Sequence, residues 1–135
     1  MRKTMLLAAV ALLTSTLTIG DGAALGRRTG AGSPGAATQV TVPADPTGLT
    51  VTEITSSSIT IAWTDNSGDE DGFKIEKCAG ANCSDFQWLA NMPAGVTNIT
   101  EWGLGKNKTY KYRVCAFNSA GDSGYTNTTT ATTTR

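Results

Sequence analysis

Histidine is absent from the 135-residue sequence. Its absence excludes Ser–His–Asp and Cys–His nucleophile systems and removes the commonest nitrogen ligand of zinc. The sequence also has no glycine-rich phosphate loop that opens a helix, and no segment outside the N-terminal region has the apolar period of a helix. We therefore predict that the protein is not an enzyme and that it carries no cofactor.

Basic residues are scarce in the C-terminal two thirds of the chain. From Pro43 to the end, ten Asp and Glu residues outnumber seven Lys and Arg residues, which leaves a net charge of about −3 at neutral pH. A general nucleic-acid-binding protein needs a basic face, and attraction to an anionic membrane surface needs one as well. Nucleic acid and membrane surfaces are therefore not expected partners.

Long apolar runs are confined to the N-terminus. Arg2 and Lys3 precede a largely apolar stretch, residues 5–19, and small residues follow it. The stretch is too short, and too rich in Thr and Ser, for a spanning helix of about 20 apolar residues. We interpret residues 1–24 as a cleaved secretory signal peptide. This interpretation predicts a secreted protein, extracellular or at the cell surface, with no membrane insertion after cleavage.

The residues that follow the apolar stretch are small and polar. Residues 25–43 are rich in Gly and Ala, and such a segment buries too little apolar surface to offset the entropy lost on ordering its backbone. We expect a flexible linker there. Residues 44–135 remain for one folded domain, a length that suits a small β-sandwich.

Short alternating segments separated by turn residues fill this domain. Ile59, Ile61 and Trp63 alternate with more polar or smaller neighbours, which is the period of a half-buried strand. Segments of this kind predict an all-β, seven-stranded antiparallel sandwich. The expected strands cover residues 49–54, 58–63, 73–77, 86–92, 98–101, 110–116 and 125–133.

Two longer motifs carry a family resemblance. The runs WTDNSGDEDGFKIEK and GLGKNKTYKYRVCAFNSAGDSGYTN, with their spacing, resemble the fibronectin type III modules of secreted bacterial proteins over residues 44–134. The resemblance implies an immunoglobulin-like topology, with strands A, B and E in one sheet and G, F, C and C′ in the other. Trp63 matches the core tryptophan of strand B. Leu104 followed by Tyr110 matches the tyrosine corner, whose phenol bonds back to the backbone.

A complete sandwich with no catalytic motif favours one class of function. We expect a secreted, non-catalytic interaction or adhesion module, or a spacer. Its partner would be an extracellular protein or polysaccharide, which the sequence does not identify further. The family motifs specify fold strongly and function hardly at all.

Three cysteines leave one pairing to decide. Cys78 and Cys83 flank the turn CAGANC between strands C and C′, and close cysteines of an exported domain usually pair. Closing so short a loop stabilises the fold by about 2 kcal/mol. The competing pair is Cys78 with Cys115, which the expected register of strands C and F places too far apart. We predict a Cys78–Cys83 disulfide, with Cys115 free or in an intermolecular link.

An acidic loop is the weak candidate for a metal site. Asp65, Asp69 and Asp71 lie in the run between strands B and C, and Asp122 is expected at the same pole. Calcium prefers several oxygen ligands, so these carboxylates are candidates. The alternative is ordinary turn chemistry in a solvated loop, and we favour it. An EF-hand register fails in this run, so we predict no metal site.

Trp88 and Trp102 match no core position of the family. Exposed indoles can stack on sugar rings or anchor a protein interface, so both residues are the candidate binding surface. Each could instead cover a local edge of the core, since scattered surface aromatics are normal. The alternative function is therefore a carbohydrate-binding module that uses Trp88 and Trp102. It requires both indoles on one continuous surface.

Overall fold

The computed structural model describes residues 38–135. The signal peptide predicted over residues 1–24, and the linker as far as residue 37, lie outside the described residues. Within residues 38–135 there is no helix, so none is present there that could cross a membrane.

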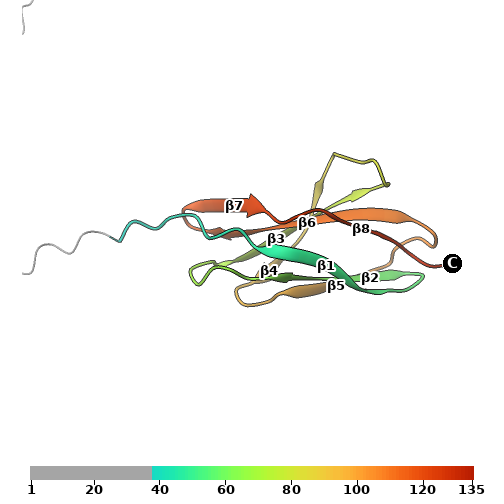
Figure 1. The fold of residues 1–135 in the computed structure, drawn as a ribbon, viewed down its shortest axis with the longest axis horizontal. Coiled ribbons are helices and arrows are strands. Elements are labelled where there is room, and N and C mark those ends of the chain that lie inside the picture. The colour runs from blue at the N-terminus through green and yellow to red at the C-terminus, as the bar shows by residue number, and fades with distance from the viewer. Residues whose placement is uncertain (1–37) are drawn as a thin grey trace, which may run out of the picture. The chain divides into compact units, whose positions relative to one another are not determined.

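Two antiparallel sheets pack face to face as a sandwich (Figure 1). The first has the order β1-β2-β5, and the second has the order β4-β3-β6-β7, with β8 also paired to β6. The all-β sandwich and the predicted division of strands between the sheets are confirmed. The strands are β1 (Thr47–Ile54), β2 (Ser58–Thr64), β3 (Gly72–Ala79), β4 (Gln87–Pro93), β5 (Asn98–Trp102), β6 (Thr109–Asn118), β7 (Gly121–Tyr125) and β8 (Thr129–Thr132).

The structure has eight strands where seven were expected, because the last segment is divided. β7 pairs with the end of β6 and β8 with its beginning. Between them, Thr126 bonds to Val114 through both its backbone N–H and its hydroxyl, at 2.8 and 3.0 Å. The Asn127 amide then bonds to both the N–H and the C=O of Leu49 on β1, each at 2.9 Å. These side-chain bonds replace ladder bonds between β7 and β8, and the Asn127 bonds also tie this segment to β1 of the other sheet.

The core lies between the sheets and follows the period of two. Ile59, Ile61 and Trp63 of β2 are buried against Phe73 and Ile75 of β3, as the alternation predicted. The Trp63 and Phe73 rings meet edge to face, with centroids 5.5 Å apart and planes at 62°. The other buried members of this cluster are Leu49, Leu104, Tyr112, Val114, Ala116 and Ala131.

The tyrosine corner has the predicted form. Leu104 is buried in the loop that joins β5 to β6, and Tyr110 packs half-buried against the core. The Gly105 N–H donates to the Tyr110 phenol oxygen at 3.3 Å. This bond fastens the loop before β6 to the strand itself.

A polar network joins the two sheets beside the core. Glu101 of β5 accepts a hydrogen bond of 2.7 Å from the Tyr112 hydroxyl of β6 and forms an ion pair with Lys77 of β3. Tyr112 is buried, and this burial raises the pKa of its phenol well above the usual range. The hydrogen bond to Glu101 and the carboxylate charge act in the same direction.

Candidate interaction surface

The outer face of the five-stranded sheet carries the densest group of interacting aromatic and charged side chains. Ile75 of β3 and Val114 of β6 point into the core, so their neighbours Glu76 and Arg113 point away from it. Glu76 lies opposite Arg113 on one side and opposite Trp88 of β4 on the other. These three residues therefore form a row across three adjacent strands.

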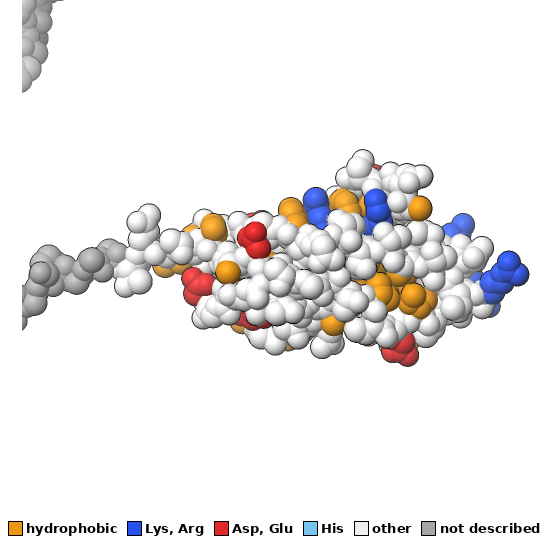
Figure 2. Space-filling model, viewed as in Figure 1, with side chains coloured by type: hydrophobic (Ala, Val, Ile, Leu, Met, Phe, Trp, Pro, Cys, Tyr) orange, Lys and Arg blue, Asp and Glu red, His pale blue; other side chains and the backbone are white. Residues whose placement is uncertain are grey.

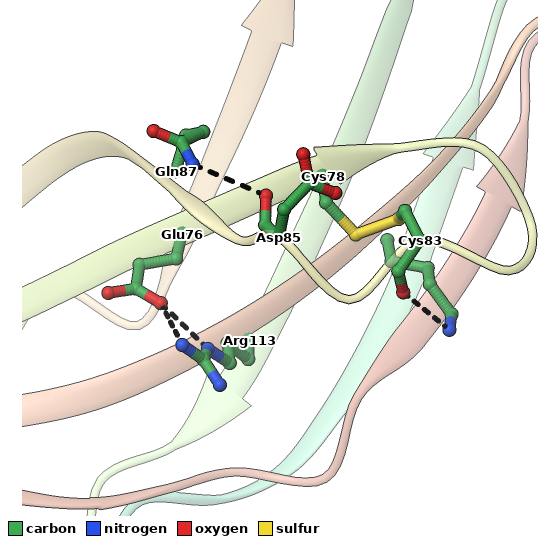
Figure 3. Close-up of a disulfide and its surroundings, with 7 residues drawn as sticks. Glu76, Cys78, Cys83, Asp85, Gln87 and Arg113 are labelled. Carbon is green, nitrogen blue, oxygen red and sulfur yellow. Dashed lines mark hydrogen bonds and ion pairs between the residues drawn. A yellow bond between two sulfur atoms is a disulfide. The ribbon is translucent and has the colours of Figure 1, made fainter.

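Arg113 is held in place from several directions. Its guanidinium lies 4.3 Å from the Phe86 ring centroid and 3.9 Å from that of Tyr125. Its Nε donates to Glu76 Oε2 at 2.7 Å, and its Nη2 lies 2.6 Å from the same oxygen (Figure 3). A guanidinium stacked on two rings and bonded to a carboxylate has few alternative orientations.

Tyr125 completes this cluster. Its hydroxyl donates to Glu76 Oε1 at 2.9 Å, while 42% of the residue stays exposed. Partial burial and the hydrogen bond to Glu76 raise the pKa of the phenol to about 12. Tyr125 is therefore neutral at physiological pH, and both Glu76 oxygens are occupied as acceptors.

A second ion pair lies on the same face. Lys74 of β3 contacts both carboxylate oxygens of Asp122 on β7, at 2.5 and 2.7 Å. Its ammonium also lies 5.3 Å from the Phe117 ring centroid. Lys74, Glu76, Arg113 and Asp122 are thus all in ion pairs with one another. We call the whole set the aromatic–ionic face: Lys74, Glu76, Phe86, Trp88, Asn91, Arg113, Phe117, Asp122 and Tyr125.

Trp88 is the most exposed aromatic residue of the aromatic–ionic face. Its exposed fraction is 66%, and its indole N–H donates to Asn91 Oδ1 at 2.8 Å. The hydrogen bond holds the ring in one orientation on the edge strand. An oriented and exposed indole in the same row as a fixed arginine is a pre-organised contact point.

Trp102 is as exposed as Trp88 but lies on the other side of the sandwich. Its exposed fraction is 72%, and it pairs with Ser58 at the end of β5. Thr60 and Thr100 share a hydroxyl hydrogen bond of 2.9 Å on the outer face of the three-stranded sheet, and Trp102 follows Thr100 by two residues. The period of a strand therefore places Trp102 on that face. The expectation that the two indoles form one binding surface needs correction, since the sheets turn them to opposite faces.

The acidic candidates for a metal site are not brought together. Asp65 Oδ1 accepts a bond of 2.9 Å from the Ser67 N–H, and Asp69 Oδ1 accepts one of 2.6 Å from the Ser67 hydroxyl. Asp122 is paired with Lys74. Within residues 38–135, Asp71 and the others form no group of three or more ligating side chains. Asp65 and Asp69 thus do what acids do in turns, which is to bond their own loop.

The predicted disulfide is present. Cys78 and Cys83 are joined across the turn between β3 and β4, with their Cα atoms 6.0 Å apart (Figure 3). Cys115 is buried and unpaired, and it lies opposite Lys74, four positions along β3 from Cys78. Burial raises the pKa of the Cys115 thiol to about 11, and the nearby Asp122 charge adds to the shift.

The aromatic–ionic face was only partly found from the sequence. Trp88 was a candidate, but Phe86, Arg113 and Tyr125 were not. The sequence did contain one indication. Glu76 and Arg113 occupy outward positions of the alternating pattern, on strands expected to be neighbours. No pocket opens in the part of the chain that the structure describes, so the face offers contact by its surface alone.

Comparison with known proteins supports this architecture. The family model of the fibronectin type III domain matches residues 44–132. A crystal structure of domains A168–A170 of titin is similar at 24% identity with a TM-score of 0.61, and chicken CNTN1 FN1–FN3 at 25% with the same TM-score. Each match covers 70% of this chain and 33% of the other, so the chain spans about a third of those fragments. The structure of FN3tt is similar at 23% identity, with a TM-score of 0.60, over 71% of this chain and 99% of the other.

Proposed function

The chain belongs to the fibronectin type III family, and on that basis we propose that it is an exported, non-catalytic module that binds another protein through its aromatic–ionic face. Modules of this family serve in general as interaction or spacer units rather than as catalysts. The proposal has three parts that experiments can test: that the module binds a partner rather than serving as a spacer, that it binds through this face, and that it is exported.

One observation carries the proposal. Tyr125 is exposed and stacked on the guanidinium of Arg113, which the protein itself holds in place, and Trp88 is exposed in the same row, on the other side of Glu76. Trp, Tyr and Arg are the residue types that dominate binding energy at protein interfaces. A spacer needs no such cluster on its surface.

The pairing of charges also favours a protein partner. Glu76 with Arg113, and Lys74 with Asp122, are neutralised within the aromatic–ionic face. Burying an already paired charge costs less than burying an isolated one. The face can therefore be covered by a largely uncharged surface, and the fixed side chains lose little entropy on binding.

The geometry does not favour the alternative of a two-tryptophan sugar platform. Because Trp88 and Trp102 lie on opposite faces, one saccharide chain cannot stack on both. Trp88 alone, bonded to Asn91, is a single stacking position. A protein interface uses the whole cluster around Trp88, which is the better account of the residues gathered there.

Two features support export. The apolar stretch after Arg2 and Lys3 has the pattern of a secretory signal. The Cys78–Cys83 bond belongs to a class of bond that persists mainly in oxidising compartments. A cell-surface or matrix role in adhesion is consistent with both features. Mass spectrometry of the chain from culture medium tests export, and a medium-borne chain with an intact Met1 contradicts signal cleavage.

The binding proposal is tested by capture of surface proteins from producing cells. The parent chain, Trp88→Ala, Tyr125→Ala and Trp102→Ala are immobilised and compared. Trp102→Ala is the matched control, because it removes an equally exposed indole from the other face. We expect the first two substitutions to weaken capture of a common partner by 10-fold or more, as hot-spot losses of about 2 kcal/mol would. If only Trp102→Ala loses the captured partner, the assigned face is contradicted. If neither the parent nor any variant captures a partner, the spacer role is favoured.

A further inference from the structure

Charged residues outside the ion pairs are unevenly distributed along the long axis of the sandwich: acids gather in one end loop, while the lysines lie at the other end together with the exposed acids Glu53 and Asp85. At one end, where β2 finishes and β3 begins, lies the loop with Asp65, Asp69 and Asp71, and Asp45 joins it because its carbonyl accepts from Asn66. We call these four acids the acidic pole. Figure 2 shows acidic side chains more frequent toward this end and basic ones toward the end that holds the C-terminus.

The opposite end carries exposed lysines and an exposed indole. β5 ends there with Trp102, and the loop to β6 follows with Lys106 and Lys108. All three residues are exposed. We call Trp102, Lys106 and Lys108 the basic pole.

Neither pole is neutralised by the rest of the described chain. The ion pairs within residues 38–135 are Lys74–Asp122, Lys77–Glu101 and Glu76–Arg113. None of them includes a residue of either pole. The charges of the two poles are therefore available to an outside partner, which is not true of the charges on the aromatic–ionic face.

One molecule cannot join its own poles. β2 runs from the basic pole at Ser58 to the acidic pole at Thr64, and the antiparallel partners of β2 make this distance rigid. A second copy meets no such limit. The acidic pole of that second copy offers carboxylates that can pair with Lys106 and Lys108. Because every chain carries one acidic pole and one basic pole, the two are always present in equal numbers. The small net charge of the folded part, about −3, opposes the approach of two copies only weakly.

We propose that copies of this chain associate head to tail, with the basic pole of one copy docked on the acidic pole of the next. Trp102 supplies the apolar anchor of this contact, and the lysines and the loop carboxylates supply its orientation and its encounter rate. The contact is heterologous, since a different surface is used on each copy. It therefore extends into open chains rather than closed dimers. The association is independent of the aromatic–ionic face.

Sedimentation velocity of the full chain at several concentrations is the first test. The Debye length is about 30 Å at 0.01 M salt and about 3 Å at 1 M salt. We expect a sedimentation coefficient that rises with protein concentration at about 0.01 M salt, and a monomer at about 1 M salt. A monomer under both conditions overturns the proposal, and so does association that does not change with salt.

Two complementary variants test the polarity of the contact. Lys106→Gln/Lys108→Gln disables the basic pole, and Asp69→Asn/Asp71→Asn disables the acidic pole. Each variant alone should associate only at about 2- to 25-fold higher protein concentration than the parent, the combined effect of two lost charge pairs, and the comparison is made below that concentration. Mixed in equal amounts, they should form dimers and nothing longer, because each variant keeps one working pole. Chains in either variant alone, or no dimer in the mixture, overturn the proposal.

Single substitutions separate this contact from others. Trp102→Ala should weaken self-association by at least about 5-fold, and each lost charge pair by about 1.4- to 5-fold. Trp88→Ala is the matched control and should leave self-association unchanged. Residues 1–37 are the same in every variant, so association through them would not respond to these changes. If the chain binds added polyglutamate but does not associate with itself, the partner of the basic pole is an acidic peptide and the proposal of a second copy is overturned.

Discussion

Removal of the Tyr112 hydroxyl is the sharpest test of how the two sheets are held together. It donates to Glu101 on the other sheet at 2.7 Å, and Glu101 also pairs with Lys77. The Glu101 side chain is only 11% exposed, so water replaces a lost donor poorly. Tyr112→Phe should therefore lower the free energy of unfolding at pH 7 by about 1.5–3 kcal/mol, the range for a hydrogen bond to a charged group.

The same substitution predicts a pH dependence of known sign. The pKa of Tyr112 is raised in the folded protein above its ordinary value of 10.0, chiefly by burial. The stabilisation that this shift represents is complete below pH 10 and is lost as the pH rises above it, because the unfolded chain then ionises first. The advantage of the parent over Tyr112→Phe should shrink by about 1.4 kcal/mol at pH 11.

Denaturant unfolding from pH 7 to pH 11 measures both effects. Glu101→Gln and the double variant complete a cycle at pH 7, for which we expect a coupling energy of about 1–3 kcal/mol between the two positions. A coupling energy near zero, or a difference between parent and Tyr112→Phe that stays constant up to pH 11, would refute the bond between the sheets.

Three further predictions concern the core and the cysteines. Trp63→Ala should cost about 3–5 kcal/mol and unfold most of the domain at 37 °C, so a melting temperature within a few degrees of the parent would contradict its burial. Peptide mapping without reductant should recover Cys78 linked to Cys83, and reduction should lower stability by about 2 kcal/mol without abolishing the cooperative melt. Cys115, with its pKa raised to about 11, should react with a thiol reagent at pH 8 at least about 100-fold more slowly in the native protein than in denaturant, and equal rates would refute its burial.

Much of the core could be predicted from local patterns, whereas the sheet arrangement was implied by the family resemblance. The alternation of Ile59, Ile61 and Trp63 identified an inward face without knowledge of the partner strand, because side chains alternate strictly along a strand. The short turn between Cys78 and Cys83 likewise favoured one disulfide pairing, because the two cysteines are close in the sequence. In both cases the residues that decide the outcome lie within a few positions of each other in the sequence.

The binding candidates were harder, because they depend on which strands become neighbours and on how each strand is rotated. Trp88 and Trp102 look alike in the sequence, yet the bulge in the pairing of β3 with β4 and the position of β5 in the other sheet set them on opposite faces. The Arg113 cluster is assembled from β3, β6, β7 and the residue before β4. The periodicity of a single segment cannot predict a cluster whose members come from four different segments.

The sequence by itself determined the strand period, the tyrosine corner, the disulfide and the family, since each rests on local spacing or on motifs that survive without a partner. Only the tertiary structure decided that Arg113 is held between Phe86 and Tyr125 and that Glu101 ties the sheets together through Tyr112. It also decided that the acidic loop and the exposed Lys106 and Lys108 lie at opposite ends of the sandwich. The physical reason is that stacking, ion pairing and burial act over a few ångströms in space, and residues far apart in the chain reach that range only when the two sheets have packed.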